Sequence, residues 1–302
     1  MIRLLHWRAA VALLAPAVCG AILGWWTTAN FNPSTLLLYL LGSFFTVLGM
    51  NVLNDYRDFR AAVQSADVKF TGGIFATAYH LLATARVQPG IARTYAHLLL
   101  LLGAIFQGAL VLLIGWPVLF FYGLSLLFLY AYGAPPVRYG YRGWLLGEIG
   151  IFFSYGLLPF VGGYWVQAQS LSWLPLWVSI PFALLTVLLL QSYHLIHYRR
   201  DWLMQKRTAV VLAGPTRTLD ISALLALIIY AALLCIISVA HLPLIALSTL
   251  AALPLPLKAL SRRRDEPLTV EDAFQLHFVT VSAIIWTGLL FCGALLANRL
   301  LF

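Results

Sequence analysis

Four polar side chains on one short stretch have the types and the spacing of a metal site. They follow an apolar run and supply two amides and two carboxylates: Asn51, Asn54, Asp55 and Asp58. In a helix, Asn51, Asp55 and Asp58 lie at i, i+4 and i+7, so their side chains face one way. Oxygen ligands of this kind suit Mg²⁺. On this stretch alone, a helix end that simply reaches water stays an open alternative.

A second polar stretch repeats this arrangement further along the chain. His194, His197 and Asp201 follow another apolar run at i, i+3 and i+7, and a basic loop comes after them. In a single helix, this spacing allows all three side chains to contact one cation. The alternative is two histidines that form hydrogen bonds at an interface. Because the two stretches form a weak internal repeat, we expect them to meet over one cavity.

The elements that position these residues must be membrane helices. The chain is 62% hydrophobic and 10% charged, with a mean hydropathy of +0.90. No soluble fold of this length buries so much apolar surface, and the apolar runs are continuous, which indicates helices. The net charge of +9 does not indicate nucleic-acid binding, because the charges punctuate apolar spans. The three cysteines lie inside such spans and indicate packing, not a disulfide or a metal cluster.

We therefore predict an all-α polytopic membrane protein that forms a single domain over residues 1–302. Nine transmembrane helices are expected. Their approximate ranges are 9–27, 34–54, 91–113, 116–133, 144–166, 172–197, 219–239, 242–260 and 277–300. The first range is interpreted as a span and not as a cleaved signal peptide.

The basic residues predict the orientation of these spans. Of the 19 Lys and Arg residues, all but Arg299 lie at the N-terminus or in and beside four polar loops, 55–90, 134–143, 198–218 and 261–276. The positive-inside rule then places the N-terminus and these loops in the cytoplasm and the C-terminus outside. The acidic residues fall on the same face, so we expect the site on the cytoplasmic side. A carboxylate near hydrocarbon is costly and indicates function.

Three groups of segments carry a family resemblance. The first is 51–58 with Asp67 and 70–73, the second is 130–143 with 147–148 and 164–167, and the third is 201–208. Together they resemble the UbiA superfamily of intramembrane prenyltransferases, closest to the branch that prenylates 1,4-dihydroxy-2-naphthoate in menaquinone synthesis. The resemblance implies a helical bundle around a lipid-accessible cavity that cytoplasmic loops cap. The membrane in question would be that of a bacterial or archaeal cell.

The resemblance also implies roles for individual residues. Both acidic motifs would hold Mg²⁺ and, through it, the diphosphate of an isoprenoid donor, with Asp55, Asp58 and Asp201 as the catalytic residues and Asn51 and Asn54 in support. Candidates for direct phosphate contacts are Arg138, Lys206 and Arg207. Candidates for walls that stabilise an allylic cation are Tyr132, Tyr139 and Tyr141. Ordinary loop charge and interfacial aromatic residues are the alternatives for these two groups.

The second motif departs from the family pattern. His197 stands where the family has an aspartate, His194 stands at the preceding polar position, and only Asp201 keeps its carboxylate. Gln64 likewise stands where this branch often has an aspartate. Imidazole suits Mn²⁺ better than Mg²⁺. The expected cofactor is therefore Mg²⁺ or, with His194 and His197 as metal ligands, Mn²⁺.

These features predict an enzyme that transfers a prenyl chain from a polyprenyl diphosphate to an aromatic, quinone-precursor-like acceptor. Charge neutralisation on the diphosphate would drive ionisation of the donor. Its partners would be these two substrates and membrane lipid, without nucleic acid. Two alternatives stay open: an intramembrane terpene cyclase, and a non-catalytic protein that binds isoprenoid or metal. A transporter is disfavoured because the acidic residues gather on one face.

Overall fold

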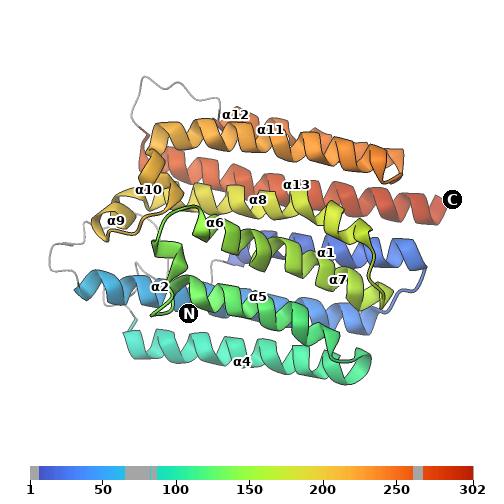
Figure 1. Cartoon of the computed structure of the whole chain (residues 1–302), viewed down its shortest axis with the longest axis horizontal. Coiled ribbons are helices and arrows are strands. Elements are labelled where there is room, and N and C mark those ends of the chain that lie inside the picture. The colour runs from blue at the N-terminus through green and yellow to red at the C-terminus, as the bar shows by residue number, and fades with distance from the viewer. Residues whose placement is uncertain (1–6, 65–81, 83–86, 261–267, 302) are drawn as a thin grey trace.

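The computed structural model describes residues 7–64, 82, 87–260 and 268–301, and the regular structure in these ranges is helical. Figure 1 shows the long helices side by side, with their axes along one common direction. The elements are α1 (Trp7–Thr28), α2 (Pro33–Gln64), α4 (Pro89–Ile114), α5 (Pro117–Gly133), η2 (Tyr139–Tyr141), α6 (Leu146–Ile151), η3 (Phe152–Leu157), α7 (Leu158–Ala168), α8 (Trp173–Ile196), α9 (Tyr198–Leu203), α10 (Ala209–Ala213), α11 (Pro215–Val239), η4 (Leu244–Ala252), α12 (Pro254–Leu260) and α13 (Val270–Leu301).

Seven helical segments in the described part of the chain are long and apolar enough to cross a membrane. They are Ala9–Thr28, Pro33–Ala61, Pro89–Ile114, Leu146–Ala168, Trp173–Ile196, Pro215–Val239 and Val270–Leu301. Two shorter apolar helices, Pro117–Gly133 and Leu244–Leu257, fall where two further spans were predicted. The all-helical membrane architecture is thus confirmed. The count of nine spans stays a prediction, because these two helices are shorter than the seven long apolar segments.

Helix α4 has a buried face that packs in the bundle and an opposite face that is exposed and apolar. Its buried side carries small residues such as Ala92, Ala96 and Gly103, and it packs against α2. A Cβ atom on Gly103 would collide with the backbone and side chain of α2, so only glycine permits this approach. The opposite side exposes large apolar residues, among them Leu101 and Leu112. An apolar face of this extent suits lipid contact.

Helix α8 lies at the centre of the bundle and packs on α11, α13, η3 and α1 (Figure 1). Its Phe182 ring contacts Phe160 of α7 and Phe291 of α13, with ring centroids 5.3 and 5.2 Å apart. All three rings are almost fully buried. This aromatic cluster fixes the distance between α7, α8 and α13, which also carry or flank the polar residues described below.

The two polar stretches lie at the same end of the bundle but differ in backbone form. Helix α2 continues without a break to Gln64, so the first stretch lies within a helix and not at its end. Helix α8 stops at Ile196, and α9 begins after His197, whose φ and ψ angles are −101° and 12°. The predicted span 172–197 thus ends within a residue of α8, and residues 194–201 do not form the single helix that a shared His194, His197 and Asp201 site would require. Figure 1 shows α9, α10 and the end of α2 together at the left of the bundle.

Candidate active site

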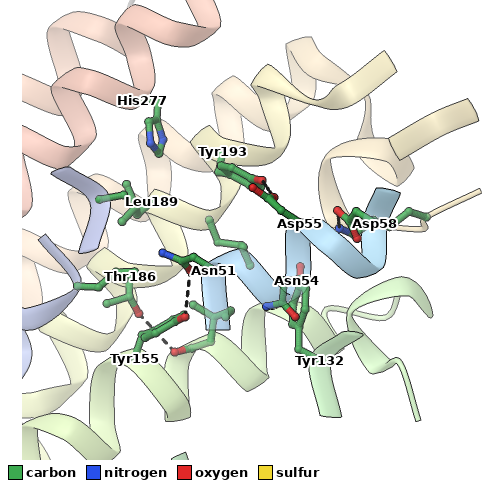
Figure 2. A pocket seen from close by; sticks show the side chains of 15 residues that line it. Asn51, Asn54, Asp55, Asp58, Tyr132, Tyr155, Thr186, Leu189, Tyr193 and His277 are labelled. Atoms are coloured by element: carbon green, nitrogen blue, oxygen red, sulfur yellow. Dashed lines mark hydrogen bonds and ion pairs between the residues drawn. The ribbon is translucent and has the colours of Figure 1, made fainter. Parts of the chain in front are cut away.

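A cavity lies between α1, α2, α5, α8 and α13, with the first polar stretch along one wall. Its lining residues are Ala9, Leu13, Asn51, Asn54, Asp55, Asp58, Tyr132, Ile151, Tyr155, Thr186, Leu189, Leu190, Tyr193, Lys206 and His277. Figure 2 shows the four polar side chains of α2 opposite side chains of α8, with Tyr132 and Tyr155 below them. The cavity therefore combines a wall of amide and carboxylate groups with aromatic, aliphatic and basic side chains.

The carboxylates of α2 are buried, in contrast to those of a helix end in water. Asp55 and Asp58 are 3% and 5% exposed. The hydroxyl group of Tyr193 donates a hydrogen bond to Asp55 Oδ1 over 3.2 Å, and that of Tyr155 donates to Asn51 Oδ1 over 3.3 Å. The interpretation of this stretch as a solvated helix end is therefore wrong.

Asp58 joins the two polar stretches. Its Oδ2 atom lies 3.1 Å from Lys206 Nζ and 3.2 Å from Arg200 Nη2. Its Oδ1 atom accepts a hydrogen bond from Tyr141. Burial and the neighbouring Asp58 raise the pKa of Tyr141 far above its ordinary value, so the phenol stays protonated and remains a donor. Asp58 and Lys206, which are 148 positions apart, thus meet at one carboxylate, as expected from the repeat.

Arg200 forms the other half of this network with its neighbour Asp201. Its Nε and Nη2 atoms lie 3.0 and 2.9 Å from Asp201 Oδ1. Burial acts to lower the pKa of Arg200, but attraction to Asp201 and Asp58 outweighs it and holds that pKa well above its usual value. Asp201 is fully buried and does not line the cavity. Four charges, those of Asp58, Asp201, Arg200 and Lys206, therefore form one buried and formally neutral cluster, called here the charge cluster.

Of the three basic residues predicted to contact phosphate, only Lys206 lines the cavity. It is 2% exposed, and its ammonium group lies 4.7 Å from the centre of the Tyr141 ring. The guanidinium group of Arg138 lies over the same Tyr141 ring, 4.2 Å from its centre. Arg207 is exposed and lines a separate hollow beside Trp144. The structure therefore does not bring Arg207 to the cavity.

The three predicted tyrosines have three different environments. Tyr132 lines the cavity, and its hydroxyl group lies 3.1 Å from His194 Nε2. Tyr139 packs edge-on against Tyr132 and donates a hydrogen bond to the Phe128 carbonyl over 2.7 Å. Tyr141 holds Asp58. Of the three rings, only that of Tyr132 is placed in the cavity wall.

The family of the chain follows from comparison with known proteins. Residues 13–288 match the model of the UbiA prenyltransferase family. The protein belongs to this family. Over 208 residues it is 28% identical to a 1,4-dihydroxy-2-naphthoate octaprenyltransferase of Mycobacterium tuberculosis, covering 68% of this chain and 66% of the relative. Over 99 residues it is 32% identical to a 2-carboxy-1,4-naphthoquinone phytyltransferase of Synechocystis, covering 33% of this chain and 32% of the relative. The match thus spans less than two thirds of either relative.

Solved UbiA homologs share the fold. One from Archaeoglobus fulgidus, bound to GPP and Mg²⁺, gives a TM-score of 0.65 at 18% identity and covers 96% of this chain and 98% of that one. Another, an apo structure from Aeropyrum pernix, gives 0.69 at 15% identity and covers 97% and 98% of the two chains. At this identity the likeness establishes the UbiA fold and nothing finer.

The two histidines of the second motif lie away from the cavity. His194 is buried against Tyr132, and the His197 ring packs edge-on against Tyr193 with centroids 4.6 Å apart. Neither imidazole lines the cavity. Within the described ranges, no group of three or more His, Cys, Asp or Glu side chains is placed to hold a metal ion. The structure thus does not assemble His194, His197 and Asp201 into a ligand set.

The two motifs differ in how well they fit the divalent cation of this family. Asn51, Asn54 and Asp55 present amide and carboxylate oxygens to the cavity beside Asp58, which is the donor set that Mg²⁺ prefers. Mg²⁺ is usually held by one or two protein carboxylates plus substrate phosphate, so a complete protein cage is not required. The second motif does not fit, because its single carboxylate, that of Asp201, contacts Arg200 and lies off the cavity.

Several residues in or beside the cavity were not predicted from the sequence. Tyr155 lies in η3, a stretch of π-helix, a form that is frequent at functional sites but has no simple sequence signal. Tyr193 lies in the last turn of α8. Its place directly before His194 of the second motif is the one feature of the sequence that could have pointed to it. Arg200 was counted only as a loop charge. His277 comes from α13, where its Nδ1 atom lies 2.9 Å from Ser192 Oγ. Asp67 and residues 70–73 lie outside the described ranges, as does the Gln64 side chain.

Proposed function

We propose that this protein transfers a prenyl chain from a prenyl diphosphate to an aromatic acceptor of the 1,4-dihydroxy-2-naphthoate kind, with one divalent cation bound at α2. The observation that carries this proposal is that Asp55, Asp58 and Lys206 together line one largely apolar cavity, with Lys206 paired to Asp58. Carboxylates alone would repel a diphosphate. A divalent cation bound between them and the lysine beside them change the net charge of the site from negative to positive, so that it attracts a diphosphate.

The cavity also offers a place for the chain of the donor. A second hollow shares Leu13 and Tyr155 with the first and is lined mainly by apolar side chains of α1, α2 and α5. A diphosphate at the Asp58 end leaves its hydrocarbon chain directed to these side chains. The Archaeoglobus homolog bound to GPP and Mg²⁺, and a second structure of it with DMAPP and Mg²⁺, support a donor of this class.

In the proposed reaction, the bond between C1 of the prenyl chain and the diphosphate oxygen breaks, and the diphosphate leaves with the electron pair. Asp55 and Asp58, with Asn51 and Asn54, would hold Mg²⁺, which when bound neutralises charge on the leaving group. Lys206 binds a phosphate oxygen, and Asp58 holds the ammonium group in place. An electron-rich carbon of the acceptor then attacks C1, and the ring loses a proton or carbon dioxide.

The Tyr132 ring is placed to stabilise the developing cation. It lines the cavity beside Lys206, whose ammonium group lies 5.7 Å from the ring centre. The His194 imidazole contacts its hydroxyl group and so orients the ring. A π-face attracts a cation without forming a bond to it. Water would capture the same cation, and the apolar residues Leu189 and Leu190 of the lining help to exclude it.

We further propose that the chain crosses a bacterial or archaeal cell membrane nine times, with its N-terminus and active site on the cytoplasmic side. The two short apolar helices, Pro117–Gly133 and Leu244–Leu257, would supply the spans beyond the seven long ones. The distribution of Lys and Arg residues supports this orientation. Mg²⁺ is the expected ion, because a preference for Mn²⁺ would require His194 or His197 as a ligand.

A single experiment tests the transferase proposal against its alternatives. Purified protein is incubated with radiolabelled geranylgeranyl diphosphate and Mg²⁺, with and without 1,4-dihydroxy-2-naphthoate, and the products are separated. We expect a labelled, prenylated naphthoate only when the acceptor is present, and none from Asp55→Asn. A cyclised hydrocarbon formed without acceptor would indicate a terpene cyclase. Recovery of intact donor in all reactions would indicate a binding protein and contradict the proposal.

A further inference from the structure

In the second motif, the guanidinium group of Arg200 occupies a position where the family resemblance implies a metal ion. Arg200 lies between the one remaining carboxylate of that motif and the first motif, 2.9 Å from Asp201 Oδ1 and 3.2 Å from Asp58 Oδ2. The same Nη2 atom makes both contacts. A metal ion shared by two motifs would link their carboxylates in the same way.

The charges of the cluster leave little attraction for a second divalent ion. Asp58 and Asp201 carry two negative charges, and Arg200 and Lys206 carry two positive ones at contact distance. The aspartate that the family has at position 197 is a histidine here, and its ring packs against Tyr193. Asp201 Oδ2 is buried without a hydrogen-bond partner, yet a single carboxylate oxygen does not make a metal site.

We propose that the guanidinium of Arg200 replaces the metal ion of the second motif, so that the protein binds its diphosphate ligand with one divalent cation, at α2. The inference rests on the proposed function for the presence of that one cation. Arg200 does not line the cavity, so it acts as a positioning residue. It contacts Asp58 and places a positive charge beside the buried Asp201 carboxylate. A guanidinium suits this role because it is always charged and contacts carboxylates through several donors.

The decisive measurement is the number of metal ions bound to each chain. The full-length protein in detergent is dialysed to equilibrium against Mn²⁺ and a thiolo analogue of geranyl diphosphate, whose bond between C1 and sulfur resists cleavage. The number of Mn²⁺ ions bound per chain is then measured. We expect about one Mn²⁺ per chain for the wild type, since in the described part of the chain the oxygen-rich face of α2 lines the cavity and the carboxylate of the second motif does not.

Removing the Arg200 charge should create the missing metal site. In Arg200→Gln, the buried carboxylates of Asp58 and Asp201 lose their shared cation, and a second Mn²⁺ is expected to replace it, raising the count to about two. In Arg200→Lys, which keeps the charge, the count should stay at about one. Arg199→Gln is the matched control, because Arg199 is adjacent and exposed. A merely structural arginine would not yield a new metal site on removal.

Each outcome decides the inference, and the wild type decides it even if Arg200→Gln does not fold. Two Mn²⁺ ions on the wild type would overturn the role of Arg200 while leaving the transferase proposal intact. One ion on both the wild type and a folded Arg200→Gln protein would also overturn it. No bound Mn²⁺ on the wild type would overturn the metal site at α2 and this inference with it.

Discussion

Neutralising Asp58 should unbalance the charge cluster and destabilise the protein as well as stop the reaction. Asp58→Asn leaves two buried cations, Arg200 and Lys206, with a single carboxylate, that of Asp201. Lys206 is 2% exposed and has Asp58 as its ion-pair partner. Removing one member of a buried pair costs about 3–5 kcal/mol, because the other charge stays desolvated. We therefore expect the free energy of unfolding to fall by about that amount.

A second substitution separates this charge effect from the loss of a side chain. In Asp58→Asn/Lys206→Met the cluster is neutral again, and methionine keeps the apolar stem of the lysine. Most of the lost stability should return, leaving a deficit of about 1 kcal/mol for the hydrogen bond from Tyr141. Prenyl transfer should not return, because the phosphate-binding ammonium group is gone. The matched control is Asp58→Asn/Arg207→Met, in which the exposed Arg207 is removed and no recovery is expected.

The assay is reversible unfolding of the purified proteins in mixed detergent micelles with increasing SDS, followed by tryptophan fluorescence. The ten tryptophans of the chain provide the signal. If Asp58→Asn lies within about 1 kcal/mol of the wild type, the pair behaves as a solvated surface ion pair and the description of a buried cluster is wrong. Equal recovery in the two double variants would refute the specific pairing of Asp58 with Lys206.

Three further predictions follow from the site and the topology. Asp55→Asn should lower the rate of prenyl transfer at least about a hundredfold, on the scale of a removed electrostatic group, while the extracted protein still elutes as a single folded species; near-normal turnover would remove Asp55 from the reaction. Reporters fused after Phe302 and inserted near Ser65 should read as external and cytoplasmic, and the same reading from both would contradict the nine-span topology. His197→Asp, made with Arg200 in place, should leave the ratio of Mg²⁺ to Mn²⁺ activity unchanged in metal titrations, because the His197 ring packs on Tyr193 outside the cavity; a shift towards Mg²⁺ would show that position 197 contacts the metal.

The first motif could be predicted from the sequence because it depends on one unbroken helix. Residues 51–64 contain no glycine or proline, so α2 continues through them, and helical spacing alone places Asn51, Asp55 and Asp58 on one face. The burial of that face was not predictable in the same way. It requires Tyr193 and Tyr155 to reach α2 from α8 and η3, and those contacts depend on how the helices pack.

The second motif could not be predicted as well, because it depends on a break in the backbone. Helical spacing for His194, His197 and Asp201 assumes one helix, whereas α8 ends at Ile196 and α9 begins two residues later. The resulting turn directs Asp201 to Arg200 and away from the cavity. No glycine or proline marks this break, and the end of the apolar run at about residue 197 is the one signal that the sequence offers for it.

The basic residues show why a rule that predicts topology does not predict a site. The positive-inside rule treats Arg199, Arg200, Lys206 and Arg207 as equivalent loop charges. In the structure, the first and last of these are exposed, whereas Lys206 is buried, the Arg200 side chain is 10% exposed, and both contact Asp58. A basic side chain is buried only where a carboxylate compensates it, and in a chain with ten acidic residues such partners are few. Which loop charges become part of the site therefore depends on which of them reach the carboxylates of the two motifs. The turn between α8 and α9 brings Arg200 to Asp58 and Asp201.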